Sequence, residues 1–372
     1  MPSIADIVRE HGGAYVARFG PGLLPSHRRA LADIAGCRTP AMGGHLLDCA
    51  DCGHREYVYH SCRNRACPQC HQQRTEEWLA QRARELLPVR YHHLVLTLPA
   101  ELREAARSRQ QAVLGALMQA AAAAVQALAR DPKYAGGRIG ILAVLHTWTR
   151  ALAWHPHVHC LVPGIALAPD REVLHPAERF LLPVRALSVI FRARMAASLR
   201  ALEPPVQLPA AVWRKPWVAF ARPCVEGAEA VLQYLARYAF RGPLSNRHLI
   251  GTEGGRVTFR YTDNRTGKPR SITVSGEEFL RRYLQHVLPK GFQRVRYYGL
   301  WSPSSRQTLR ALQLLLAPSQ QQSTLPALLA KSPRPVRPAC CPRCGSAHWH
   351  LVGRFLPAAL YCPMSPTRGP PP

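Results

Sequence analysis

Acidic residues and lysine are both scarce in this chain of 372 residues. Only 22 Asp and Glu stand against 49 Lys and Arg, and just five of those 49 are Lys, so the formal net charge is +27. So large an excess makes a compact chain repel itself unless a polyanion neutralises it. Nucleic acid is the commonest such partner, and an anionic membrane surface is the alternative.

Long apolar runs and a secretory signal are also missing. The first residues lack the basic stretch and apolar run of a signal peptide, so we expect a cytoplasmic protein. The most membrane-like stretch, 111–129, is mostly Ala and is broken by three Gln. We expect a buried helix there and no membrane partner. A hydrophobic content of 47% suffices for two or three folded domains.

Cysteine is plentiful, with twelve residues in the chain. The cytosol keeps thiols reduced, so metal or thiol chemistry is favoured over disulfides. Cys49-x-x-Cys52 and Cys67-x-x-Cys70 are separated by 14 residues, close to the spacing of paired zinc knuckles. These four thiolates are predicted to bind one structural Zn²⁺, the alternative being reduced thiols that merely pack. Spare ligands, each of which could instead be an ordinary polar residue, are Cys62, His54, His60 and His71.

A second knuckle lies near the end of the chain, where Cys341 and Cys344 form another Cys-x-x-Cys pair. It lacks a clear mate in the sequence, so zinc binding and unpaired thiols both remain open. Candidate partners are His348, His350 and Cys362.

Hydrophobic periodicity predicts helices and strands in irregular alternation. The expected strands are 94–98, 139–147, 158–162 and 217–221, with a hairpin formed by 257–261 and 271–274. The expected helices are 75–87, 101–130, 183–202, 226–240 and 277–288. This order favours an α+β fold with a largely antiparallel sheet.

Two short patterns point to chemistry on phosphate. His157 and His159 lie on one face of an expected strand, where two imidazoles can hold a divalent ion. Tyr234 and Tyr238 are one turn apart on an expected helix, so their phenols lie on the same side. Each pattern alone could be structural, a polar strand face or a pair of packed tyrosines. Together they are complementary, because a metal polarises phosphate and a phenol can attack it.

The order of motifs along the chain resembles that of a known family. In sequence, they are Cys49-x-x-Cys52, Ser61-Cys62-Arg63-x-Arg65-x-Cys67-Pro68-x-Cys70, Leu96-Thr97-Leu98-Pro99, Leu145-His146-Thr147-Trp148, His155-Pro156-His157-Val158-His159, Tyr234-Leu235-Ala236-Arg237-Tyr238, Ser245-Asn246-Arg247 and His286-Val287-Leu288-Pro289-Lys290-Gly291-Phe292. This series resembles the rolling-circle transposases of the insertion-sequence ninety-one family, which belong to the HUH endonucleases. The resemblance covers about residues 5–300.

The resemblance implies a transposase that cleaves and rejoins single-stranded DNA, with a palm-like antiparallel sheet and flanking helices. His157 and His159 would bind Mg²⁺ or Mn²⁺, and Tyr238 or Tyr234 would attack the phosphate. The products would be a 5′-phosphotyrosine and a free 3′-hydroxyl, so rejoining needs no ATP. The partners would be the ends of the protein's own element and target DNA, at the bacterial nucleoid.

One position departs from the family. Seven residues before the first metal-binding histidine, where the family often has Gln, this chain has Arg150. A guanidinium cannot ligate a cation. Either His155, His146 or another group completes the site, or metal binding is weakened. A first alternative is therefore a decayed, non-catalytic DNA-binding protein. A second is a related replication initiator or relaxase, which would share the histidines and tyrosines but not usually this N-terminal zinc module.

The expected domains follow from these motifs. Residues 1–90 would form a zinc-binding, DNA-binding domain, 91–300 the catalytic domain, 301–338 a linker, and 339–372 a candidate zinc knuckle with a disordered tail. Basic residues near the motifs are predicted to contact DNA, with Phe292, Tyr297 and Tyr298 stacking on bases. For the segment 281–298 the alternative is a solvated basic helix face. The predicted DNA contacts are Arg63, Arg65, Arg74, Arg237, Arg281, Arg282, Arg294 and Arg296.

Overall fold

A computed structural model describes residues 2–175, 182–223, 242–263, 266–316 and 340–357. The chain divides into two compact units, each assembled from distant segments. The first contains residues 1–74, 244–287 and 331–372, and the second contains 75–243 and 288–330. These interleaved units differ from the contiguous ranges expected from the sequence. Both units combine helices with antiparallel sheets, which confirms the α+β class.

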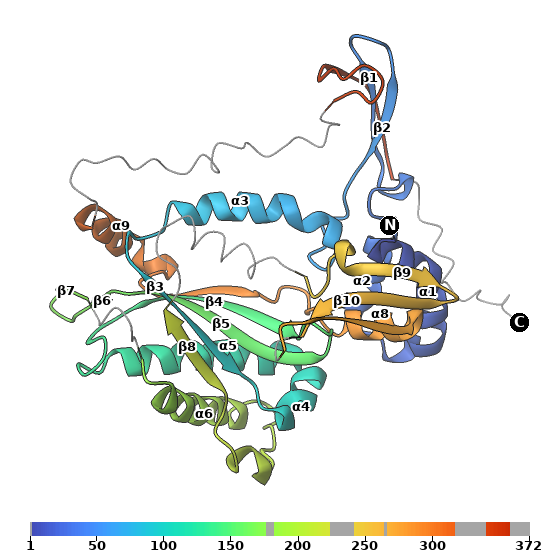
Figure 1. The fold of residues 1–372 in the computed structure, drawn as a ribbon. Helices are drawn as coiled ribbons and strands as arrows, with labels where there is room; N and C mark the ends of the chain where they lie inside the picture. The colour runs from blue at the N-terminus through green and yellow to red at the C-terminus, as the bar shows by residue number, and fades with distance from the viewer. Residues whose placement is uncertain (1, 176–181, 224–241, 264–265, 317–339, 358–372) are drawn as a thin grey trace, which may run out of the picture. The chain divides into compact units, whose positions relative to one another are not determined.

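A five-stranded sheet forms the centre of the second unit (Figure 1). Its strands, in spatial order, are β12 (Val295–Gly299), β4 (Gly140–Trp148), β5 (Trp154–Pro163), β3 (Tyr91–Thr97) and β8 (Ala219–Pro223). All neighbours are antiparallel. The expected strands 94–98, 139–147 and 158–162 are confirmed as β3, β4 and β5. β5 lies in the middle of the sheet.

Helices cover both faces of this sheet. Val158, Cys160 and Val162 of β5 pack into a core shared with helices α4 (Arg103–Ser108), α5 (Gln110–Ala129) and α6 (Val184–Arg200). Leu161 points to the other face, where it joins a second core with α3 (His71–Ala83) and α9 (Arg306–Leu315). The two-residue strands β6 (Ala166–Leu167) and β7 (Val173–Leu174) pair beside the sheet. Strand alternation therefore gives β5 two chemically distinct faces.

Helices α5 and α9 test two of the predictions made from the sequence. α5 is long and apolar enough to cross a membrane by length and composition, yet 67% of its most apolar window is buried within the protein. The expected buried helix is therefore confirmed. α9 lies inside the range 301–338 expected as linker, and that part of the prediction is wrong. Its Leu309 and Leu312 are buried in the second core, which stabilises a helix there.

The first unit contains a helical pair and a three-stranded sheet. Its elements are α1 (Ile4–Phe19), α2 (Pro25–Gly36), β9 (Leu249–Glu253), β10 (Arg256–Thr262), β11 (Pro269–Ser275) and α8 (Gly276–Leu284). β10 and β11 confirm the predicted hairpin, with Val257 opposite Val274. Phe279 of α8 packs against Phe259 of β10, their ring centroids 5.9 Å apart. Two contacts with α1 explain why residues 244–287 belong to this unit: Arg18 pairs with Glu277 at 2.8 Å, and Ile4 N donates to Asn246 Oδ1 at 3.1 Å.

A second three-stranded sheet in the first unit joins the two ends of the chain. β1 (Gly44–Cys49) pairs with β2 (Arg55–Tyr59) on one side and with β13 (Trp349–Phe355) on the other. The C-terminal knuckle is therefore part of the N-terminal module. The predicted helix 226–240, with Tyr234, Arg237 and Tyr238, lies outside the described residues, as do 317–339 and 358–372.

Candidate active site and metal centres

Three histidine side chains converge on one face of the five-stranded sheet. His146 comes from β4, and His157 and His159 come from β5; their ligand nitrogens all lie within 4.8 Å of one another. His146 is directly opposite His157 in the strand pairing. The sheet thus brings the predicted His157–His159 pair together with His146, one of the residues considered as a third ligand.

The rings of His157 and His159 are held by hydrogen bonds through their Nδ1 atoms. Nδ1 of His157 lies 2.6 Å from the backbone oxygen of His155 and donates to it. Nδ1 of His159 lies 2.8 Å from Nε2 of His93 in β3. Such bonds fix the tautomer and leave Nε2 of each imidazole as the ligand atom. His93 was not among the site residues predicted from the sequence, where its one signal is its position just before the predicted strand 94–98.

Burial keeps the imidazoles of His93, His157 and His159 uncharged at neutral pH. It lowers the pKa of His157 to about 4 and that of His93 to about 3. Burial, followed by the charges of neighbouring histidines and Arg294, lowers the pKa of His159 well below its usual value. Neutral imidazole is the form that binds a metal ion, so the group fits a divalent cation.

Neither Arg150 nor His155 belongs to this group of converging ligand atoms. Arg150 is exposed in the turn between β4 and β5. His155 is engaged by Arg103, whose guanidinium lies 2.7 Å from its Nδ1. Among the described residues, no further His, Cys, Asp or Glu joins the three histidines. The geometry therefore selects His146 from the alternatives.

An aromatic and cationic stack borders the histidines. The ring of Trp148 lies 4.6 Å from that of His146, nearly parallel to it. The guanidinium of Arg294 lies over Trp148, 5.0 Å from its ring centre. Arg294, a predicted DNA contact, is therefore close to the candidate active site.

Eight cysteines form two groups in the first unit, and this corrects the predicted zinc site. Cys49 and Cys52 do not join Cys67 and Cys70. Instead, Cys49 and Cys52 lie beside Cys341 and Cys344, because β1 pairs with β13 from the far end of the chain. The two groups, each with its sulfurs within 4.8 Å of one another, are Cys37, Cys62, Cys67 and Cys70, and Cys49, Cys52, Cys341 and Cys344.

The first group lies at the end of α2, with Cys37, Cys67 and Cys70 buried and Cys62 half-buried. Cys37, which the sequence analysis missed, lies 3.6 Å from Cys70, and Cys62 is also 3.6 Å from Cys70. The Cys62 backbone N–H points at the Cys37 sulfur from 3.5 Å. Hydrogen bonds from Cys62 and Cys67 lower the pKa of the Cys37 thiol. Four sulfurs bound 2.3 Å from a tetrahedral ion would lie about 3.8 Å apart, so the group fits zinc.

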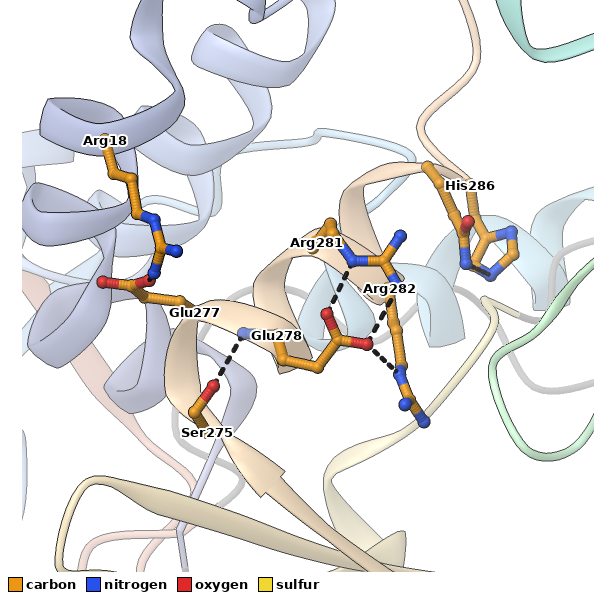
Figure 2. A network of polar contacts seen from close by, with 8 residues as sticks. Arg18, Ser275, Glu277, Glu278, Arg281, Arg282 and His286 are labelled. Carbon is orange, nitrogen blue, oxygen red and sulfur yellow. Dashed lines mark hydrogen bonds and ion pairs between the residues drawn. The ribbon is translucent and has the colours of Figure 1, made fainter. Parts of the chain in front are cut away.

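The remaining predicted DNA contacts differ in their surroundings. Arg63 and Arg65 are exposed beside the first cysteine group. Arg281 and Arg282 both pair with Glu278, each with one contact of 2.6 Å (Figure 2). The bond from Arg281 is the main cause that lowers the pKa of Glu278 to about 2. The two arginines therefore share one permanent negative charge.

Several side chains of the segment 292–298 that were predicted to contact DNA instead contact other parts of the protein. Phe292 is 3% exposed and belongs to the core, so its expected role in base stacking is wrong. Tyr297 accepts a hydrogen bond of 3.0 Å from Trp78 in α3. Arg296 lies over Phe292, and its guanidinium donates to the Gly115 carbonyl of α5. Phe292 and Tyr297 therefore make contacts within the protein.

Comparison with known proteins connects this chain with transposition. Residues 7–98 match a family model described as "Transposase zinc-binding domain", and residues 140–308 match one described as "Putative transposase". The "Putative transposase y4qJ" of Sinorhizobium fredii is 41% identical over 318 residues, 80% of each chain. The "Transposase for insertion sequence element IS801" of Pseudomonas savastanoi pv. phaseolicola is 29% identical over 75% of this chain and 71% of its own. No solved structure matches. The family resemblance seen in the motifs is confirmed.

Proposed function

Because this chain belongs to the insertion-sequence ninety-one family of transposases, we propose that it cleaves and rejoins single-stranded DNA through a 5′-phosphotyrosine intermediate. The observation that carries this proposal is the convergence of His146, His157 and His159 on one sheet face. The bacterial cytoplasm, at the nucleoid, is where such a protein would meet its DNA.

The three histidines would hold a divalent cation at the scissile phosphate. When bound, the cation would withdraw charge from the phosphate oxygens. Among the residues that the structure describes, the donor set contains imidazole and no carboxylate. Mg²⁺ prefers oxygen ligands, so we favour Mn²⁺ over Mg²⁺. His93 and the His155 carbonyl would keep the ligand rings oriented.

Tyr238 or Tyr234 would supply the nucleophile. The phenol oxygen would form a bond to phosphorus as the bond from phosphorus to the 3′-oxygen breaks, and the phenolic proton would leave for solvent or a base. The cleaved strand would end in a 3′-hydroxyl, which can later attack the phosphotyrosine and release the tyrosine. With the two residues four positions apart, one tyrosine could hold a first end while the other cleaves a second.

The first cysteine group would provide a structural metal for DNA recognition. Cys37, Cys62, Cys67 and Cys70 would bind Zn²⁺ with four protein ligands, leaving no open position for catalysis. Arg63 and Arg65, exposed beside that group, would contact the phosphate backbone. Single-stranded ends of the protein's own element and target DNA are the proposed substrates.

A covalent adduct tests the proposed function. The full chain is incubated with a labelled single strand from an end of its own element and Mn²⁺, then separated under denaturing conditions. We expect an adduct that is absent from the double variant Tyr234→Phe/Tyr238→Phe, while the single variants rank the two tyrosines. DNA binding without any adduct would overturn the proposal and favour a non-catalytic DNA-binding protein.

A further inference from the structure

We propose that Cys49, Cys52, Cys341 and Cys344 bind a second structural zinc ion, which fastens the C-terminal segment 340–357 to the β1–β2 hairpin. The family model of the zinc-binding domain ends at residue 98, so two of these ligands lie far outside it. The site would be shared by segments separated by most of the chain.

The sulfur positions fit one tetrahedral ion. Cys49 Sγ lies 3.5 Å from Cys344 Sγ, and Cys52 Sγ lies 3.6 Å from Cys341 Sγ. These distances are close to the separation of about 3.8 Å expected between thiolates on zinc and far from a disulfide bond of about 2 Å. Both pairs cross between the two segments, so each half of the site contributes two ligands.

The two Cys-x-x-Cys segments have the same backbone turn. Gly53 N donates to Cys49 O at 3.0 Å, and Gly345 N donates to Cys341 O at 2.8 Å. Cys49 N donates to His54 O and Cys341 N to Ser346 O, five residues ahead in each case. The two glycines have φ of 66° and 78°, a conformation that glycine adopts without strain. Two matching turns therefore present their thiols to one point.

The pairing of β1 with β13 leads directly to the four cysteines. Cys49, at the end of β1, is opposite Trp349, at the start of β13. Ala50 N donates to His348 O at 3.0 Å, which extends the pairing toward the cysteines. The ligands are thus held at the end of a formed ladder of hydrogen bonds.

The apolar core around this sheet is small. Among the described residues, its buried members are Leu47, Cys49, Cys341 and Trp349, and two of these four are cysteines. So few side chains supply little hydrophobic free energy against the cost of ordering a distant segment. A bound metal is the usual remedy in modules of this size. Four thiolate ligands favour zinc over hard cations and leave no position open for catalysis.

Zinc content tests this site in the full chain. We expect two zinc ions per chain in the wild type, measured by mass spectrometry under native conditions. The double variant Cys341→Ser/Cys344→Ser should retain one ion, as should Cys37→Ser, which affects the first cysteine group. Cys340→Ser is the matched control, because Cys340 is exposed and outside both groups, and it should retain two. One ion in the wild type, or two in the double variant, would overturn the proposal.

A conservative variant separates loss of the site from loss of the fold. If the double variant retains no zinc, Cys344→His, which keeps four ligands, must retain two ions; failure to do so would also overturn the proposal. Hydrogen exchange provides an independent measurement. Amides of β13 should exchange at least about tenfold faster in the double variant than in Cys340→Ser, because β13 loses its anchor. Unchanged protection of β13 would contradict the proposed fastening.

Discussion

His93 Nε2 lies 2.8 Å from Nδ1 of His159, and the two rings are stacked within 7° of parallel. His93 belongs to β3 and His159 to β5, so the sheet itself sets this contact. The arrangement orients Nε2 of His159 toward the other two histidines of the candidate active site. We infer that His93 is a positioning residue for the proposed metal ion.

Replacing His93 should weaken the proposed metal site without removing a ligand. We expect His93→Ala to lower Mn²⁺ affinity by about 10- to 100-fold, the usual effect of losing a partner behind a ligand. His93→Gln keeps an acceptor for Nδ1 and should recover much of the affinity. Calorimetric titration with Mn²⁺ measures both. Equal affinities for wild type and His93→Ala would contradict the positioning role.

The third ligand can be identified in the same titration. His146→Ala should lower Mn²⁺ affinity by at least about tenfold, because its nitrogen is one of the three that converge. His155→Ala should leave affinity unchanged, since it keeps the backbone oxygen that accepts from His157. Arg150→Gln should also have no effect, because Arg150 is in an exposed turn. A larger loss in His155→Ala than in His146→Ala would reverse the assignment.

Stability should fall with acid because of buried neutral histidines. His92 is 3% exposed, and burial together with the charge of Arg90 lowers its pKa to about 4. Between pH 6.5 and pH 4 the unfolded chain binds the proton and the folded chain does not, so stability decreases as pH falls through this window. From pH 6.5 to pH 5 the free energy of unfolding should fall by about 2 kcal/mol, at about 1.4 kcal/mol per pH unit.

Urea unfolding at the two pH values measures this effect. His92→Gln should have a shallower pH dependence than the wild type by about that amount. His175→Gln, which changes an exposed histidine, is the control and should follow the wild type. Parallel pH profiles for all three proteins would show that His92 does not contribute.

The salt dependence of binding to single-stranded DNA should distinguish Arg294 from Arg296. Arg294 lies beside the histidines over Trp148, whereas Arg296 is directed to Phe292 and α5. Arg294→Gln should therefore reduce the salt dependence of binding, lowering the slope of log K against log salt by about 0.7 for one lost phosphate contact. Arg296→Gln is the control and should keep the slope. Fluorescence anisotropy over a salt series measures both, and equal slopes for all three proteins would exclude Arg294 as a contact.

The parts of the fold that the sequence predicted are those with a local signal. Strands β3 and β4 contain continuous apolar runs, and the apolar run of β5 is interrupted by His159 alone over Val158–Val162. The β10–β11 hairpin has a polar turn between two segments in which apolar and polar residues alternate. The spacing of His157 and His159 predicted a shared strand face for the same reason. Periodicity within one segment was enough for each of these.

What the sequence could not predict depends on pairing between distant segments. The spacing of Cys49, Cys52, Cys67 and Cys70 suggested one site, but β13 brings in Cys341 and Cys344 from the far end of the chain. Cys37 has no Cys-x-x-Cys partner, so nothing local identified it. His93 likewise becomes important only through its place beside β5 in the sheet. Contacts between segments that are distant in the sequence, which no local pattern encodes, decide all three.

The central claim is that a tyrosine of this transposase becomes covalently joined to the 5′ end of cleaved DNA. The most direct test is to form the adduct with Mn²⁺, digest it with protease and nuclease, and locate the remaining nucleotide by tandem mass spectrometry. The account predicts a 5′-phosphate on Tyr238 or Tyr234, with formation lost in His157→Ala/His159→Ala. A nucleotide on any other residue, or cleavage without a covalent adduct, would contradict it.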